Sequence, residues 1–445
     1  MKKNILFILA FIPTLLLAQH TISGSYSPAE DFKYAFLYRV TPTTATFITN
    51  ADVASYGTFK MSLDKNIAPG TFRLVYAQPQ EENNFDFIYN GKEDIAFNFS
   101  KKKGVTFTTS SENKMYASYN KSIALINQSI RNYYGAQKVD KEGYKSIFDI
   151  LRKTQNEFEK ASEGMLINHF IKACRPYIPS AYEDVATFSN NIKSNYYKNI
   201  DFSDKELQNS NFLIKNATGY VYGFVDRNAP NASYIENIDV TVKAIENNNK
   251  VKKTILDIMW RKFAEAGNEP IANYITETYL LDLAKADQDT KILESIVPFR
   301  NISLGKVAPD FDIPLNTNKS TKLSALNSSE NYILVFWSTT CSHCLNEVPQ
   351  LEAFIKPIDK EKIQVIAIAL EDDKERWEEI IDDFPDFIHV LGMGKWNNKI
   401  GNSYNVTGTP SYFVLNSNKE IIAKPYDVVS VKNYFGSRLI ETSKN

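Results

Sequence analysis

Short runs in which apolar and polar residues alternate fill the first part of the chain, a period that predicts β-strands. Ile95, Phe97 and Phe99 alternate with small or polar residues, just after an Asn90-Gly91 pair that is a hairpin signal. Aromatic and β-branched residues also dominate the segments 33–40, 57–63, 70–76 and 85–89. We therefore expect an antiparallel β-sandwich over residues 19–112, with a structural or binding role because no cluster of acids, histidines or cysteines lies in it.

The period of the pattern changes after residue 112. Apolar residues now recur at helical spacing, as in the series Tyr119, Ile123, Ile126, Ile130 and Tyr133. Further helical stretches are expected at 255–263 and 279–296. We predict a region of amphipathic helices over 113–298, followed by a linker at 298–307.

Apolar strands alternate with helices in the last part of the chain, 299–445. The pattern predicts strands at 332–337 and 364–370, helices at 341–355, 374–382 and 430–439, and a hairpin that joins 412–415 to 420–424. This order indicates an α/β domain with a mostly parallel central sheet covered on both faces. At 445 residues, a chain of about three domains is the reasonable expectation.

Residues 1–18 have the pattern of a secretory signal peptide. Lys2 and Lys3 precede an apolar run from Ile5 to Leu17, and Ala18 stands before polar residues. The run is shorter than the ~20 residues that a membrane span prefers, although an uncleaved N-terminal anchor is the alternative. We expect an exported protein that is soluble after cleavage, with the periplasm as its compartment.

Composition narrows the range of partners. The protein is 43% hydrophobic and 23% charged, as soluble globular proteins are, and its net charge of −1 gives no reason to expect nucleic acid or an anionic membrane as a partner. Three cysteines are too few for a disulfide scaffold of this size.

Two of these cysteines form the motif Cys341-Ser342-His343-Cys344 between a predicted strand and a predicted helix. The first sulfur would lie at the helix N-terminus, where free N–H groups and the macrodipole stabilise a thiolate. The second lies one turn on and can close a disulfide with it. Half of a zinc site is the alternative, but zinc needs two more ligands, and His389, the nearest downstream candidate, has no partner.

Motifs around these cysteines resemble those of thioredoxin-fold proteins, and more narrowly the exported TlpA/ResA-like thiol–disulfide oxidoreductases. The matching motifs are Ala308-Pro309-Asp310-Phe311, Phe336-Trp337, Cys341-Ser342-His343-Cys344, Glu347-Val348-Pro349, Trp377 and Val406-Thr407-Gly408-Thr409-Pro410. They cover roughly residues 301–445 in order. The β-rich region, which ends in Thr108–Asn113, is similar to a domain of unknown function that often precedes such modules.

The resemblance implies roles for individual residues. It makes Cys341 the attacking thiol, in agreement with its place at the helix terminus, and Cys344 the resolving thiol. It implies that Glu347 is a buried acid near the active site that accepts the proton of Cys344; an exposed helical glutamate is the alternative. It also implies a cis-proline at Pro410 that faces the disulfide and leaves the Thr409 backbone to pair with an extended client.

Each of the remaining candidate residues has two possible roles. His343 either stabilises the thiolate and makes the pair more oxidising, or is a solvated histidine with little effect. Trp337 either flanks the active site, where it would touch a client, or belongs to the core. Cys174 follows Leu166 and Phe170 at helical spacing, so we favour a buried structural thiol over a resolving or intermolecular one.

We therefore expect a thiol–disulfide oxidoreductase that uses no cofactor. Its partners would be client proteins with disulfides or thiols and an upstream membrane or exported thiol donor. A binding or scaffold protein with a redox-sensing or docking thioredoxin module is the alternative, and a peroxidase ranks lower because no Pro-x-x-x-Thr-x-x-Cys arrangement surrounds Cys341. The direction of electron flow stays open: the resemblance suggests a reductant, for example in cytochrome c maturation, whereas His343 favours an oxidant.

Overall fold

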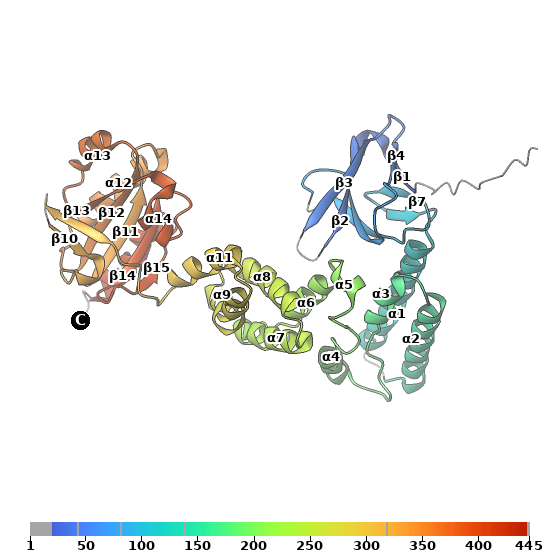
Figure 1. Ribbon diagram of the computed structural model, residues 1–445. Coiled ribbons are helices and arrows are strands. Elements are labelled where there is room, and N and C mark those ends of the chain that lie inside the picture. The colour runs from blue at the N-terminus through green and yellow to red at the C-terminus, as the bar shows by residue number, and fades with distance from the viewer. Residues whose placement is uncertain (1–19, 42–43, 81, 137–138, 317–318, 443–445) are drawn as a thin grey trace, which may run out of the picture. The chain divides into compact units, whose positions relative to one another are not determined.

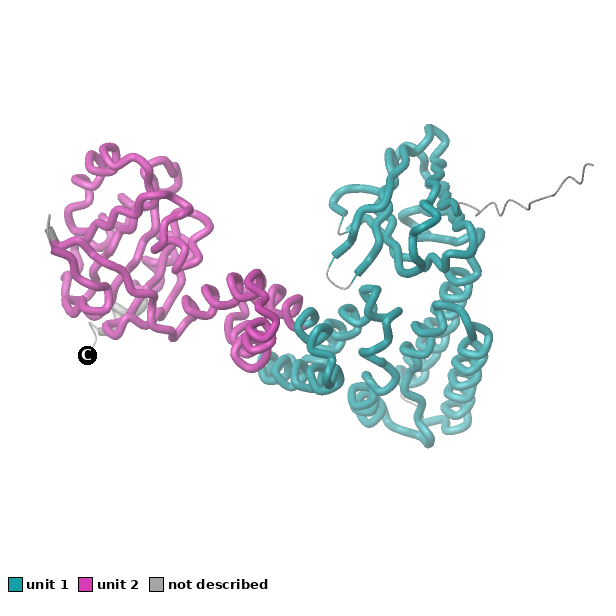
Figure 2. The backbone as a smooth tube through the Cα atoms, viewed as in Figure 1, with its two compact units in different colours: residues 1–255 teal, residues 256–445 magenta. Residues whose placement is uncertain are grey.

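The computed structural model describes residues 20–41, 44–80, 82–136, 139–316 and 319–442 (Figure 1). The predicted signal peptide at 1–18 lies outside these residues. The chain divides into two compact units, 1–255 and 256–445, with the boundary inside helix α8 (Figure 2). The overall order of a β-rich region, a helical region and an α/β domain confirms the predicted fold class. None of the described helices combines the length and apolar character that a bilayer crossing requires.

Two four-stranded sheets form the β-sandwich within the described residues, in the orders β4-β1-β7-β8 and β3-β2-β5-β6. Apolar side chains of both sheets, among them Ile22, Leu37, Phe72 and Phe97, meet in one buried core. The strands are β1 (Thr21–Tyr26), β2 (Tyr34–Val40), β3 (Ala45–Asp52), β4 (Thr58–Ser62), β5 (Gly70–Val75), β6 (Asn84–Tyr89), β7 (Ile95–Ser100) and β8 (Gly104–Phe107).

The sandwich differs from the expectation in two details. Strands β1 and β7 pair in parallel, whereas the other strand pairs of the sandwich are antiparallel. The hairpin predicted at Asn90-Gly91 is wrong, because β6 pairs with β5 while β7 pairs with β1 and β8. The turn instead carries the chain from one sheet to the other, with Gly91 at a left-handed φ of 74°.

Helix α1 (Ser111–Gly135) begins the helical region and buries Tyr119, Ile126 and Ile130 along one stripe, as its spacing predicts. Ser110 caps this helix by accepting a hydrogen bond from the Asn113 N–H. The following helices are α2 (Lys141–Ala161), α3 (Ile167–Ala173), α4 (Val185–Ser194), α5 (Lys205–Gln208), α6 (Phe212–Gly223), α7 (Pro230–Ile245), α8 (Asn249–Glu265), α9 (Glu269–Ile275), α10 (Leu281–Ala286) and α11 (Thr290–Asn301).

Two predicted boundaries in the helical region differ from those in the structure. The helix expected over 279–296 is broken between α10 and α11, where Gln288 has a φ of 52°. The predicted linker starts too early, because Pro298 lies inside α11. A proline near the end of a helix removes only one backbone hydrogen bond, so the last turn can continue through it.

The α/β domain contains a five-stranded sheet in the order β13-β12-β11-β14-β15. Strands β11, β12 and β13 are parallel, whereas β14 is antiparallel to both β11 and β15, so the sheet is mixed but four of its five strands run in one direction, as predicted. Its strands are β11 (Asn331–Trp337), β12 (Ile363–Glu371), β13 (Phe387–Met393), β14 (Ser411–Asn416) and β15 (Ile421–Ala423), and a separate pair is β9 (Asp312–Asn316) and β10 (Lys319–Lys322).

Both faces of this sheet are covered. Helices α12 (Ser342–Ile355), α13 (Lys374–Ile381) and α15 (Val428–Thr442) contribute to the core on one face. The other face packs against α14 (Lys399–Ser403) and against apolar residues of the segment that contains β9. The central strand β11 therefore ends, at its carboxyl end, at the start of α12, where the two cysteines lie.

Candidate active site

The two cysteines occupy different environments at the start of α12. Cys341 is the N-cap residue of the helix, and its sulfur accepts a hydrogen bond from the Cys344 N–H at 3.2 Å. The Cys341 side chain is partly exposed, whereas Cys344 has no exposed surface. The structure holds both as free thiols. Of the two cysteines, only Cys341 can therefore reach and attack a disulfide of another molecule.

Their acidities differ in the same direction. Partial burial alone would raise the pKa of the Cys341 thiol, but hydrogen bonds with the side chains of Cys344 and Thr409 and from the backbone N–H groups of Cys344 and His343 together lower it below 9.0. Burial, together with the hydrogen bond to Cys341, raises the pKa of Cys344 to about 12. At neutral pH the pair thus holds a reactive outer sulfur and a protonated inner one.

This difference predicts the pH dependence of alkylation. Because the thiolate is the nucleophile and the pKa of Cys341 is lowered, the rate of its reaction with iodoacetamide should rise with pH through a midpoint below 9.0 and be lost as pH falls through that midpoint. Cys344 should begin to react only as pH approaches about 12. Peptide mass mapping of the alkylated sites over pH gives both curves, and a Cys341 midpoint above 9.0 would contradict the assignment.

Thr409, which precedes Pro410, contacts the Cys341 sulfur. The Thr409 carbonyl accepts a hydrogen bond from the Cys341 thiol at 3.2 Å, although 68 residues separate the two. The Thr409–Pro410 peptide bond is cis, the geometry that the resemblance implies. In the part of the chain that the structure describes, the Thr409 N–H has no hydrogen-bond partner.

Glu347 lies one helical turn beyond Cys344 and is half-buried. Its Oε2 accepts hydrogen bonds from the Tyr412 hydroxyl at 3.0 Å and from the Val428 N–H at 2.9 Å. Burial and the Glu347 carboxylate raise the pKa of Tyr412, and the Cys344 sulfur acts on it in the same direction. Tyr412 is thus near both the Glu347 carboxylate and the Cys344 sulfur. Tyr412 was not identified from the sequence, because it lies in an apolar strand that has no distinctive motif.

Trp337 and His343, the other two predicted site residues, lie in different environments. Trp337 is 0% exposed and packs edge-on against Phe384 at a centroid distance of 6.1 Å, so its side chain lies in the core rather than on a surface that a client can touch. His343 is exposed on the first turn of α12, where its side chain faces solvent.

A small cavity of about 240 Å³ adjoins the attacking sulfur. Trp396, which is 54% exposed, stands beside it on the loop after β13, and sequence reasoning did not single this residue out. Two hydrogen bonds hold that loop: Gly394 N–H donates to the Glu371 carbonyl, and the Asn398 amide donates to the Met393 carbonyl. The cavity is lined by Ser338, Thr340, Cys341, Leu370, Lys395, Trp396 and Thr409.

Glu371, at the end of β12, connects two walls of this cavity. Its side-chain Oε1 accepts a hydrogen bond from the Thr339 N–H, in the loop that leads to Cys341, while its backbone carbonyl holds the loop of Trp396. The side chain is only 1% exposed, and its Oε2 finds no partner among the described residues. Sequence reasoning missed this residue too, because an acid at a strand end resembles an ordinary solvated turn residue.

Cys174 belongs to the other unit of the chain. It is the C-cap of α3, and burial raises the pKa of its thiol to about 11. A thiol that stays protonated at neutral pH is a poor nucleophile, in keeping with a structural role. Across the described residues, no three or more His, Cys, Asp or Glu side chains are grouped so that they could hold a metal ion.

One protein family matches part of this chain. Residues 330–421 match a family described as thioredoxin-like. The C-terminal domain is thioredoxin-like. The match spans both cysteines, Glu347, Thr409 and Pro410, as well as Glu371 and Trp396. The narrower resemblance to the TlpA/ResA-like branch stays a prediction, and comparison with curated proteins gives no match.

Several solved structures are similar to parts of this chain. The thioredoxin domain of a thiol-disulfide oxidoreductase from Bacteroides vulgatus is 22% identical over 30% of this chain and 96% of its own, with a TM-score of 0.27. A thiol:disulfide interchange protein from Bacteroides sp. is 20% identical over 31% and 90%, with a TM-score of 0.28. A thioredoxin-like protein from Bacteroides caccae is 19% identical over 58% and 96%, with a TM-score of 0.39. These scores are low, so the functional account rests on the residues of this chain.

Proposed function

We propose that this protein is an exported thiol–disulfide oxidoreductase that exchanges electrons between its Cys341–Cys344 pair and client proteins. The observation that carries the proposal is the pairing of an accessible Cys341 of lowered pKa with a buried Cys344 of raised pKa on one helical turn. Disulfide exchange needs such an attacking thiolate and a protected second thiol. Export rests on the leader pattern at 1–18 and agrees with the chemistry, because client disulfides persist outside the cytosol.

In the first step, the Cys341 thiolate attacks one sulfur of a client disulfide. A bond forms between Cys341 and that sulfur, the client S–S bond breaks, and the second client sulfur leaves as a thiolate that takes up a proton. The Thr409 N–H, which has no partner among the described residues, would pair with the client backbone, and the exposed ring of Trp396 would contact an apolar client side chain beside the reacting sulfur.

In the second step, Cys344 attacks Cys341. The mixed disulfide removes the hydrogen bond between the two sulfurs that keeps the proton on Cys344, while burial still disfavours its thiolate. Glu347 is the base that we assign to this proton, with the Tyr412 hydroxyl beside it. The Cys341–Cys344 bond forms as the bond to the client breaks, so the client leaves with two electrons and two protons. A membrane-bound or exported thiol donor would then reduce the disulfide again.

Reduction of a protein disulfide by the full chain tests this function. With excess dithiol as electron source, the wild-type chain should accelerate insulin reduction, and Cys341→Ser should lower the catalysed rate by about 100-fold or more because the nucleophile is gone. Ser342→Ala, at an exposed neighbouring position, is the matched control and should retain the activity. Equal rates for the wild type and Cys341→Ser would leave the chain without the proposed enzyme activity.

A further inference from the structure

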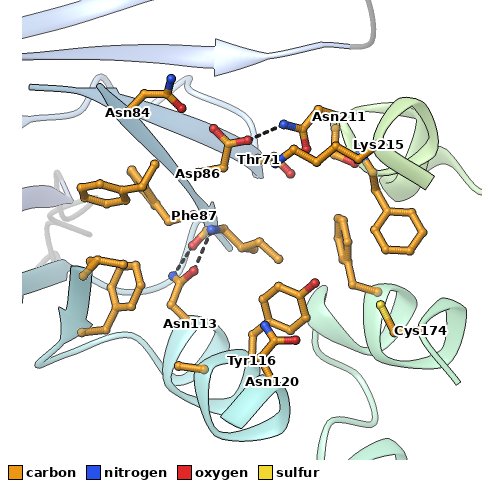
Figure 3. A pocket seen from close by; sticks show the side chains of 18 of the residues that line it. Thr71, Asn84, Asp86, Phe87, Asn113, Tyr116, Asn120, Cys174, Asn211 and Lys215 are labelled. Carbon is orange, nitrogen blue, oxygen red and sulfur yellow. Dashed lines mark hydrogen bonds between the residues drawn. The ribbon is translucent and has the colours of Figure 1, made fainter. Parts of the chain in front are cut away.

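A second cavity lies in the unit formed by residues 1–255, apart from the thioredoxin-like domain (Figure 3). Its volume is about 620 Å³, within the range of ordinary small-molecule sites. One wall belongs to strands β5 and β6 and to the end of β8, and the others belong to α1, α3 and the start of α6. The cavity is thus built where the β-sandwich meets the helices.

Hydrogen bonds fix both sides of this cavity to strand β6. The Asn113 side chain of α1 accepts from the Ile88 N–H at 2.8 Å and donates to the Ile88 carbonyl at 2.7 Å. Asn211, the N-cap residue of α6, donates to Asp86 at 2.7 Å across 125 residues of sequence. Figure 3 shows both sets of bonds. Since the walls are tied together directly, the cavity is preformed, which lowers the cost of binding a ligand.

Most of the wall is uncharged, and aromatic rings are prominent in it. Burial raises the pKa values of Tyr116 and Cys174, so the hydroxyl and the thiol that line the cavity are neutral at physiological pH. An apolar ligand would therefore displace water from the surfaces of aromatic rings and not from charged groups. The aromatic lining residues are Phe85, Phe87, Phe107, Tyr116, Phe170 and Phe212.

Charge is confined to one end. Asp86 is already neutralised by Arg73, whose Nε and guanidinium NH₂ group donate to its two oxygens at 2.7 and 3.0 Å, and it also accepts a hydrogen bond from the Asn211 amide. Lys215 follows Asn211 by one helical turn and lines the same end, and its side-chain ammonium has no ion pair or hydrogen bond within the described ranges. Two cations and one carboxylate leave a net positive charge there.

We propose that this cavity binds a small amphipathic anion, with an aromatic or otherwise apolar body against the rings and a carboxylate beside Lys215. The volume, the aromatic rings of the wall and the Lys215 ammonium, which is unpaired among the described residues, all fit such a ligand. The site is independent of the redox chemistry, so the unit of residues 1–255 would have a binding function of its own.

Three probes with one biphenyl body and different heads test the proposal: 4-biphenylacetate, 4-biphenylmethanol and 4-biphenylmethylamine. Calorimetric titration of the full chain should give the tightest binding for the carboxylate. Lys215→Met should weaken the carboxylate about 3- to 5-fold, the effect of losing one exposed ion pair, and leave the alcohol unchanged. Lys205→Met, a comparable exposed lysine on α5, is the control and should change neither.

A second variant and a second readout locate the site. Ala117→Trp fills the cavity from an exposed position on α1 and should abolish binding of all three probes. In a Cys341→Ser, Cys344→Ser background, bound carboxylate should slow the reaction of Cys174 with a small maleimide, and binding in this background is also independent of the proposed enzyme activity. Equal affinity for the three heads, binding that survives Ala117→Trp, or binding of unfolded polypeptide but of none of the probes would overturn the proposal.

Discussion

Replacing Cys344 with serine is expected to turn the protein into a trap for its clients. Cys341 should still attack client disulfides, because its sulfur is accessible. The substitution removes the thiol hydrogen bond that lowers the Cys341 pKa most, but the hydrogen bonds with the Thr409 side chain and with two backbone N–H groups stay. Without the second thiol, the mixed disulfide can be released only by thiols from solution. Release should slow by about 100-fold or more, because an intramolecular attack benefits from a high effective concentration.

Non-reducing electrophoresis and mass spectrometry measure this result directly. The Cys344→Ser chain should form a covalent adduct through Cys341 with a disulfide-containing client, and the adduct should disappear on addition of dithiothreitol. The Cys341→Ser chain, which keeps the buried thiol, is the matched control and should form none. Adducts through Cys344 in that control would reverse the assigned roles of the two cysteines.

Replacing Trp337 with alanine should destabilise the thioredoxin-like domain by roughly 3–5 kcal/mol, the usual cost of truncating a large buried side chain. Trp337 is 0% exposed in the core beneath α12 and α13. Trp396→Ala removes a ring that is 54% exposed, and its effect on stability should stay within about 0.5 kcal/mol. If Trp396 contacts clients as proposed, it is Trp396→Ala that should slow reduction of proteins while leaving small disulfides unaffected.

Labelling of Cys344 reports the opening of this domain, because its sulfur has no exposed surface in the folded state. In a Cys341→Ser background, Trp337→Ala should accelerate that labelling by roughly two to three powers of ten or more, since ~1.4 kcal/mol corresponds to a factor of ten. Trp396→Ala should change it less than about 3-fold. If Trp337→Ala left labelling unchanged and instead impaired reduction of clients alone, Trp337 would be a contact residue and not a core residue.

The fold of the thioredoxin-like domain was largely predictable because its strands and helices carry strong local signals. The run from Tyr332 to Trp337 is apolar throughout and forms the buried central strand β11. The sandwich was harder, since an Asn90-Gly91 turn has the same sequence whether it joins two strands of one sheet or carries the chain to a second sheet. Pairing partners of strands depend on contacts between distant residues, which the local pattern does not contain.

The candidate site also contains both residues that the local sequence identifies and residues that only contacts between distant segments identify. The C-x-x-C motif and Pro410 are visible in the sequence because their spacing and local context are distinctive. Tyr412, Glu371 and Trp396 are not, because each acquires its place through a partner far away: Tyr412 through Glu347, 65 residues earlier, and Glu371 through Thr339, 32 residues earlier. Trp396 also belongs to a loop whose hydrogen bonds, and not its composition, bring it beside Cys341.

Redox titration of Cys341 and Cys344 tests the central claim most directly. The full chain is equilibrated in glutathione buffers of graded potential, and its free thiols are counted with a maleimide that adds mass. We predict one reversible transition in which both thiols disappear together, with the slope of a two-electron couple, ~30 mV per tenfold change in the equilibrium ratio, and its midpoint will also show whether the pair acts as a reductant or an oxidant. Cys174 should stay a thiol throughout, whereas Cys341 and Cys344 thiols that persist at every potential, or that are lost one at a time, would contradict the account.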